Sequence, residues 1–212
     1  ERIFKFDAKG KYIDTLFEQT YDEENAPFQY GNIVELKEKD GELQFLLIED
    51  GAIGQYVLSE GSAHPAKTHW NASYDFSDAA YDSVKDRMII CTRQGNIIAL
   101  DKRGKEETLF KGNGSEIPWN VTVDEQGTIY FTELISCGVY TLQDGKVEEV
   151  ASSDYSYYTI DRNDKGMLVT TDFGGICLQR DGEEEYIEQF TVKNLVYRCI
   201  VWIVSAVAVL YA

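Results

Sequence analysis

IPWNVTVDEQGTIYFTELISCGVYTLQDGKVEEV, residues 117–150, is the stretch of this sequence that decides the fold. Turn residues divide it into four short runs rich in β-branched and aromatic residues, at 120–123, 128–132, 138–142 and 146–150. The last two runs are separated by Asp144-Gly145, a pair typical of a two-residue β-hairpin turn. The stretch therefore predicts a four-stranded antiparallel meander.

The same order of strands and turns recurs in three other segments, 30–58, 78–110 and 155–190. A glycine opens the third predicted strand of each copy, at Gly54, Gly95, Gly138 and Gly175, giving steps of 41, 43 and 37 residues. A period near forty with four strands per copy is typical of β-propeller blades. A β-sandwich needs no fixed period, and a helical solenoid would show a 3.6-residue periodicity. We therefore expect an all-β chain, a β-propeller of four-stranded antiparallel blades.

The repeats predict how the chain is divided. We expect the propeller to cover residues 1–190, with a partial blade at 1–18 and blades at about 28–70, 72–115, 117–153 and 155–190. The opening segment matches the last two strands of the unit alone. Because a ring with a gap would expose strand edges, we expect an incomplete propeller from a longer chain. A small ring closed by pairing between residues 1–18 and a C-terminal strand is the alternative.

Residues Pro118 to Glu133, PWNVTVDEQGTIYFTE, resemble the NHL-type repeat, P-x-G-[IV]-A-[VL]-D-x-x-G-x-[IL]-Y-[VF]-[TA]-[DE]. Asn120 stands where that repeat usually has glycine, and the other three copies lack the proline. Relatives of the family include six-bladed lactonase-like and lyase-like propellers. The resemblance implies the fold more directly than an activity, because one fold carries many functions.

The C-terminal run CIVWIVSAVAVLYA, Cys199 to Ala212, has no charged residue in its fourteen positions. As a helix it would span roughly 21 Å, short of the ~30 Å hydrocarbon core. We expect residues 191–212 to be a linker and the start of a transmembrane helix, with a buried strand or core helix as the alternative. Lys193 and Arg198 precede the run, but large domains cross membranes largely regardless of charge. The hypothesis places the propeller on the extracytoplasmic side of the cell membrane.

Charge and cysteine spacing exclude several kinds of partner. Thirty-seven acidic residues against twenty basic ones give a formal net charge of −17, which excludes a phosphate-binding surface for nucleic acid. The four cysteines, Cys91, Cys137, Cys177 and Cys199, form no CxxC motif. We therefore expect free thiols and no zinc knuckle.

Loops between second and third strands, and loops between blades, open on one face of a propeller beside its channel. We expect a small ligand or a protein partner to bind there. The candidate ligand-binding residues are Arg93, Trp119, Asn120, Glu133, Tyr157 and Asp172. No cofactor is expected. Glu133, Asp172 and Asn120 carry the oxygen ligands that suit Ca²⁺ or Mg²⁺, but the favoured interpretation is that such residues cap turns.

Catalytic patterns are scarce. The two histidines, His64 and His69, fall in a segment that we expect to be a loop between blades, and no G-x-S-x-G, HExxH or P-loop motif is present. No catalytic residue is predicted. The leading hypothesis is a non-enzymatic ligand-binding or sensory domain of a membrane-anchored signalling protein. The alternatives are a lactonase- or lyase-like hydrolase with a divalent metal at the channel mouth, and a protein-interaction scaffold.

Overall fold

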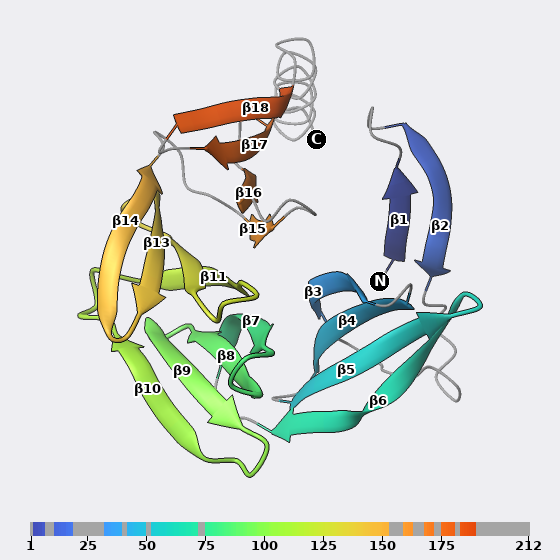
Figure 1. The fold of residues 1–212 in the computed structure, drawn as a ribbon, viewed down its shortest axis with the longest axis horizontal. Coiled ribbons are helices and arrows are strands. Elements are labelled where there is room, and N and C mark those ends of the chain that lie inside the picture. Colours follow the sequence, from blue (N-terminus) through green and yellow to red (C-terminus); the bar gives the residue numbers. More distant parts are fainter. Residues whose placement is uncertain are drawn as a thin grey trace, which may run out of the picture.

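The computed structural model describes residues 2–6, 11–18, 32–39, 42–49, 52–71, 75–152, 159–162, 168–171, 175–180 and 183–189. These residues form one two-stranded and four four-stranded antiparallel sheets arranged around a centre (Figure 1). The two-stranded sheet pairs β1 (Arg2–Phe6) with β2 (Tyr12–Glu18). The all-β fold class with four-stranded antiparallel blades is thereby confirmed.

Each larger sheet is a meander of four consecutive strands, and its first strand lies nearest the centre (Figure 1). The first four-stranded sheet contains β3 (Asn32–Lys39), β4 (Glu42–Glu49), β5 (Ala52–Ser59) and β6 (Ser62–Asn71). The second contains β7 (Phe76–Asp82), β8 (Arg87–Thr92), β9 (Asn96–Asp101) and β10 (Glu106–Lys111). The third contains β11 (Pro118–Val123), β12 (Ile129–Glu133), β13 (Gly138–Gln143) and β14 (Lys146–Ser152). The fourth contains β15 (Thr159–Arg162), β16 (Leu168–Thr171), β17 (Gly175–Arg180) and β18 (Glu183–Gln189).

Burial explains why middle and outer strands differ in composition. The middle strands β8, RMIICT, and β9, NIIALD, are almost continuously apolar and buried. A sheet covered on both faces requires such runs. The outer strands β10, EETLFK, and β14, KVEEVAS, expose most of their residues and carry the charges. The sheets therefore pack face to face, with a solvated strand at the rim.

The hydrophobic core is a series of layers between neighbouring sheets. One layer joins β1 and β2 to the β3–β6 sheet through Ile3, Phe17 and Phe45. The next joins that sheet to β7–β10, and a third joins β7–β10 to β11–β14. Among the described residues, adjacent sheets thus bury their facing sides against each other, the arrangement expected of stacked repeats.

One expectation for the histidines was wrong. His64 and His69 lie in β6, an outer strand paired with β5, and not in a loop between blades. The turn Glu60-Gly61, with φ of 53° and 75°, reverses the chain and allows this pairing. Pro65 is tolerated because β6 is the edge strand of its sheet among the strands that the structure describes.

The predicted linker and membrane segment, 191–212, lies outside the described residues. In the part of the chain that the structure describes, no helix has the length and apolar character needed to cross a membrane.

Candidate ligand-binding site

Glu133, at the end of β12, holds together two loops at one end of the third four-stranded sheet. Its Oε1 accepts a hydrogen bond from the Ile117 N–H at 2.6 Å. Its Oε2 accepts from the Ile135 N–H at 2.9 Å and from the Ser136 N–H. Burial alone would raise the pKa of Glu133, but these N–H groups favour the charged form and lower the pKa below its ordinary value. Glu133 therefore fixes the blade connection and the β12–β13 loop as one unit.

The β12–β13 loop presents apolar side chains to solvent. Leu134 is 37% exposed and Ile135 is 58% exposed. The Leu134 N–H donates to the Ile117 carbonyl at 3.0 Å, and Cys137 adopts a φ of 57°. Because the backbone is held on both sides, the loop is an ordered, partly apolar surface.

Asn120 and Asp78 lie together on neighbouring inner strands, β11 and β7. The side-chain oxygen of Asn120 accepts a hydrogen bond from Thr132 Oγ1 at 3.3 Å, and its side chain also bonds Asp78. Asp78 Oδ2 accepts from the Val121 N–H at 2.9 Å, across the blade boundary, and Oδ1 accepts from the Ala79 N–H at 2.9 Å. These contacts connect the second and third four-stranded sheets beside the centre.

Burial dominates the protonation of Asp78. It raises the pKa of Asp78 from 3.8 to about 8, although the hydrogen bonds from Val121, Ala79 and Asn120 act in the opposite direction. The charge of Glu35 adds to the rise. A carboxyl group with such a pKa carries its proton at neutral pH.

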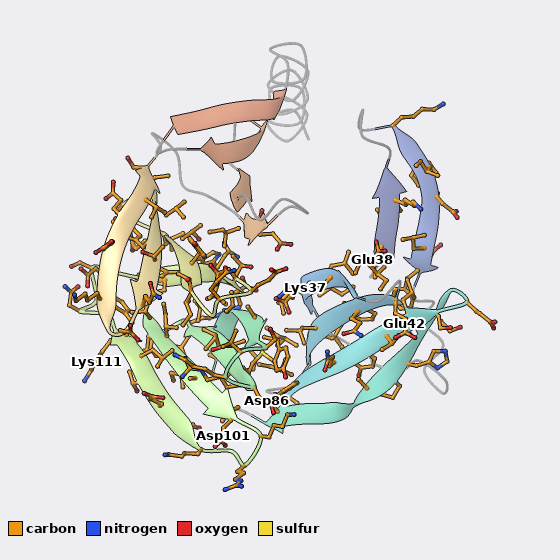
Figure 2. The ribbon with its side chains drawn as sticks, viewed as in Figure 1. Lys37, Glu38, Glu42, Asp86, Asp101 and Lys111 are labelled. Atoms are coloured by element: carbon orange, nitrogen blue, oxygen red, sulfur yellow. The ribbon has the colours of Figure 1, made fainter. Side chains whose placement is uncertain are left out.

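Glu35 makes the corresponding contact one blade earlier. From the inner strand β3 its Oε2 accepts the Tyr81 N–H of β7 at 3.4 Å, and its Oε1 lies 2.5 Å from Lys37 Nζ. Lys37 is labelled beside the centre in Figure 2. Burial raises the pKa of Glu35, and Lys37 opposes the rise. Glu35 and Asp78 thus each bond the inner strand of the next blade.

The structure brings together some of the predicted site residues. Trp119 and Asn120 lie on β11, and Glu133 pairs opposite Pro118 at the same end of that sheet. Arg93 lies exposed in the turn after β8, with its N–H bonded to the Asp75 carbonyl at 2.9 Å. Tyr157 and Asp172 lie outside the described residues.

The repeat places Asp78 at the start of an inner strand, but neither Asp78 nor Glu35 is among the ligand-binding residues predicted from the sequence. The available signal was an acidic residue inside a strand whose neighbours are apolar, as in FSDAAYD. An acid in such a place is buried and must find hydrogen-bond donors.

A cation site at Glu133 and Asn120 has little support in these contacts. Both oxygens of Glu133 accept backbone N–H groups, and the Asn120 oxygen accepts from Thr132. Among the described side chains, no group of three or more His, Cys, Asp or Glu residues could hold a metal ion. The observed role of Glu133 is to cap a loop.

No protein-family model matches the sequence, and no curated protein matches it. The fold is similar to solved structures at 12–15% sequence identity. Catalytically inactive virginiamycin B lyase from Staphylococcus aureus with quinupristin matches with a TM-score of 0.52 over 76% of this chain and 57% of that chain. The nidogen/laminin complex matches at 0.55 over 75% and 65%, and a luciferin-regenerating enzyme at 0.54 over 77% and 62%.

The chain thus spans less than two thirds of the length of these structures. At such identities the similarity shows the fold alone. The fold of this chain is a β-propeller.

Proposed function

We propose that this chain is a non-enzymatic ligand-binding or sensory propeller domain, with NHL-type blades, of a membrane-anchored signalling protein. The observation that carries the binding role is the β12–β13 loop, which Glu133 holds through three backbone N–H groups while Leu134 and Ile135 face solvent. A surface ordered before binding loses less conformational entropy when a partner arrives.

The contacts of the polar residues beside this loop support binding over chemistry. The side chains of Glu133 and Asn120 make hydrogen bonds within the fold. Arg93 is exposed at the corresponding end of the preceding sheet. Both histidines lie in the outer strand β6. A loop surface with exposed apolar side chains, and a cation in the equivalent turn of the preceding sheet, fits a small anionic ligand or a protein segment.

The membrane attachment and the extracytoplasmic location rest on the apolar run of residues 199–212. Expression of a longer form in intact cells, followed by external protease treatment, tests them. Cleavage of the propeller in unbroken cells is the expected result, and a membrane-free product would contradict the proposal.

The binding role is tested by screening small acids for an increase in melting temperature, since a ligand that binds the native state stabilises it. A compound that binds the loop should stabilise wild type and Val147→Asp, and should stabilise Ile135→Asp much less. Val147 is a matched control because it is 40% exposed on the outer strand β14. If every stabilising compound acts equally on Ile135→Asp, the loop is not the binding surface.

A lactonase- or lyase-like enzyme is the second candidate, and Asp78 is the observation that favours it. A carboxyl group with a pKa of about 8 can give up a proton near neutral pH, and strongly shifted groups are frequent in active sites. The described oxygen atoms do not fit the divalent cation, so this candidate rests on Asp78. Lactone hydrolysis that is lost in Asp78→Asn would support it, and a wild-type protein without hydrolysis would remove it.

A further inference from the structure

A concave site lies between two blades, at the end of the strands opposite to the loop held by Glu133. It is a cavity of about 470 Å³ between the β7–β10 and β11–β14 sheets. The cavity is lined by Ile129, at the start of β12, and by Leu142 near the end of β13, whereas Glu133 ends β12 and Gly138 begins β13. Its volume is in the range of small-molecule sites.

Two rigid turns form one wall of this cavity. Asp82 Oδ1 accepts the N–H groups of Val84 and Lys85 at 3.1 and 3.0 Å. Asp124 Oδ1 makes the same kind of contact in the next blade, with Gln126 at 2.9 Å and Thr128 at 2.7 Å. The two turns are fixed by equivalent aspartates, so the wall exists before any ligand binds.

The two turns also lie against each other. Gly127 has a φ of 80°, and a Cβ atom there would lie 3.4 Å from Val84 Cβ. Such close packing of turns from neighbouring blades gives the cavity a defined shape.

Charged groups of both signs line the cavity above an apolar floor. The cations are Lys85 and Arg87, and the acids are Glu107 and Asp144. The floor includes Leu109, Ile129 and Leu142, and two amides, Gln126 and Gln143, complete the polar wall.

Arg87 forms two ion pairs, one with the buried Asp82 and one with the exposed Glu107. Its Nε lies 3.0 Å from Asp82 Oδ2, and the Asp82 side chain is fully buried. Its Nη1 lies 3.4 Å from Glu107 Oε2. The Glu107 side chain is 67% exposed and the Arg87 side chain 13%, and a pair at this distance with one solvated partner contributes little. A ligand carboxylate can replace Glu107 on the guanidinium group, which favours paired contacts with carboxylates.

We propose that this interblade cavity binds a small zwitterion with apolar side chains, an apolar dipeptide. Its carboxylate contacts Arg87 and Lys85, and its ammonium group contacts Glu107 and Asp144. The apolar side chains lie on the floor made by Leu109, Ile129 and Leu142. Both signs of charge are needed because a simple anion would meet the two carboxylates, and a simple cation would meet the two basic groups.

Calorimetric titration with leucyl-leucine tests the proposal on the whole chain. Saturable binding is expected at dipeptide concentrations up to about 10 mM, since small ligands of this size commonly have dissociation constants in the micromolar to millimolar range. Lys85→Glu should weaken binding at least tenfold. Asp144→Asn should weaken it several-fold, and it keeps a residue type that tolerates the φ of 50° at this position.

Two controls separate this site from non-specific binding. Lys5→Gln removes an exposed cation on β1, far along the chain from the cavity, and should leave the affinity unchanged. N-acetyl-leucyl-leucinamide, which lacks both charges, should bind at least tenfold more weakly. Amide NMR shifts should concentrate at Gly127 and Gly145, and not at Gly138.

Three results would overturn the proposal. These are the absence of saturable binding to wild type, equal affinity of the blocked and free dipeptides, and an affinity that Lys85→Glu does not change.

Discussion

Two buried carboxyl groups, those of Asp78 and Glu133, have pKa values shifted in opposite directions. Asp78 and Glu133 are 6% and 4% exposed, and both accept backbone N–H groups. Asp78 lies between two sheets, where loss of water outweighs its hydrogen bonds, and its pKa rises. Glu133 lies at the end of one sheet, where three N–H donors from two loops outweigh its burial, and its pKa falls. The surroundings of the carboxyl group, more than its exposed fraction, decide the sign of the shift.

The raised pKa of Asp78 predicts a pH dependence of stability. The group has a pKa of about 8 in the folded chain and an ordinary value of 3.8, so between these values the folded state binds more protons than the unfolded state. The contribution of Asp78 to the free energy of unfolding is fully present below pH ~4. It is lost as the pH rises toward about 8, at a rate of at most about 1.4 kcal/mol per pH unit.

Asp78→Asn should therefore flatten the fall in unfolding free energy across this range. Urea denaturation at several pH values measures the slope, with the exposed Asp144→Asn as control. Parallel curves for wild type and Asp78→Asn would show that Asp78 does not titrate as described.

Turn chemistry explains which elements could be predicted from the sequence. Asp144-Gly145 is a recognised hairpin pair, and the structure confirms the turn between β13 and β14, with φ of 50° and 76°. Glu60-Gly61 makes a similar turn without the usual Asn or Asp, so the sequence predicts a loop around His64 and His69 where the structure has β6. The hairpins were therefore predictable where the turn residues are characteristic, and not elsewhere.

The site was less predictable than the sheets. The repeat predicts Asn120 and Glu133 as site residues because of their positions in it. Glu133 bonds Ile117, Ile135 and Ser136 of its own repeat, whereas Asn120 also bonds Asp78 of the preceding blade. The Val121 N–H that Asp78 accepts lies 43 positions along the chain. No local pattern specifies such a partner, because the pairing depends on how two blades stack.

The loop between β10 and β11 depends on a glycine that has no room for a side chain. The Gly112 N–H donates to the Gly95 carbonyl at 2.9 Å, and a Cβ atom at Gly112 would lie 2.4 Å from two backbone oxygens, those of Glu116 and Gly95. Because backbone atoms cannot turn aside, Gly112→Ala should lower the unfolding free energy by about 2–4 kcal/mol.

Gly104→Ala is the matched control for that substitution. Gly104 has a φ of 77° with no heavy atom within 4 Å of the added Cβ, so its cost should be the backbone strain alone, about 1–2 kcal/mol. Urea midpoints compare the two variants. A larger loss in Gly104→Ala would contradict the steric argument.

At the scale of the whole molecule, stability is distributed over contacts between adjacent sheets. Each of the main core layers joins two sheets that are neighbours in the chain. In such an array a local change should be felt by the two sheets that share a layer, and less by the others.

Phe131 gives the sharpest test of this distribution. The Phe131 residue is 2% exposed. Its ring stacks on Tyr140 of its own sheet, with the ring centroids 5.4 Å apart, and its centroid lies 5.8 Å from that of Phe110 in the preceding sheet. Phe131→Ala should cost about 3–5 kcal/mol. Hydrogen exchange measured by mass spectrometry should show lost protection in both β7–β10 and β11–β14, with β1 and β2 little changed.

Phe45→Ala is the counterpart at the other end of the described array. Phe45 is 1% exposed, and the centroid of its ring lies 6.0 Å from that of Phe17 in β2. Protection should therefore fall in β1–β2 and β3–β6 and persist in β11–β14. If both variants lose protection equally in every sheet, the propeller unfolds as one cooperative unit. Protection lost in the substituted sheet alone would instead show that the core layers between blades contribute little to stability. A layer that stabilises both sheets should lower protection in both when it is disrupted.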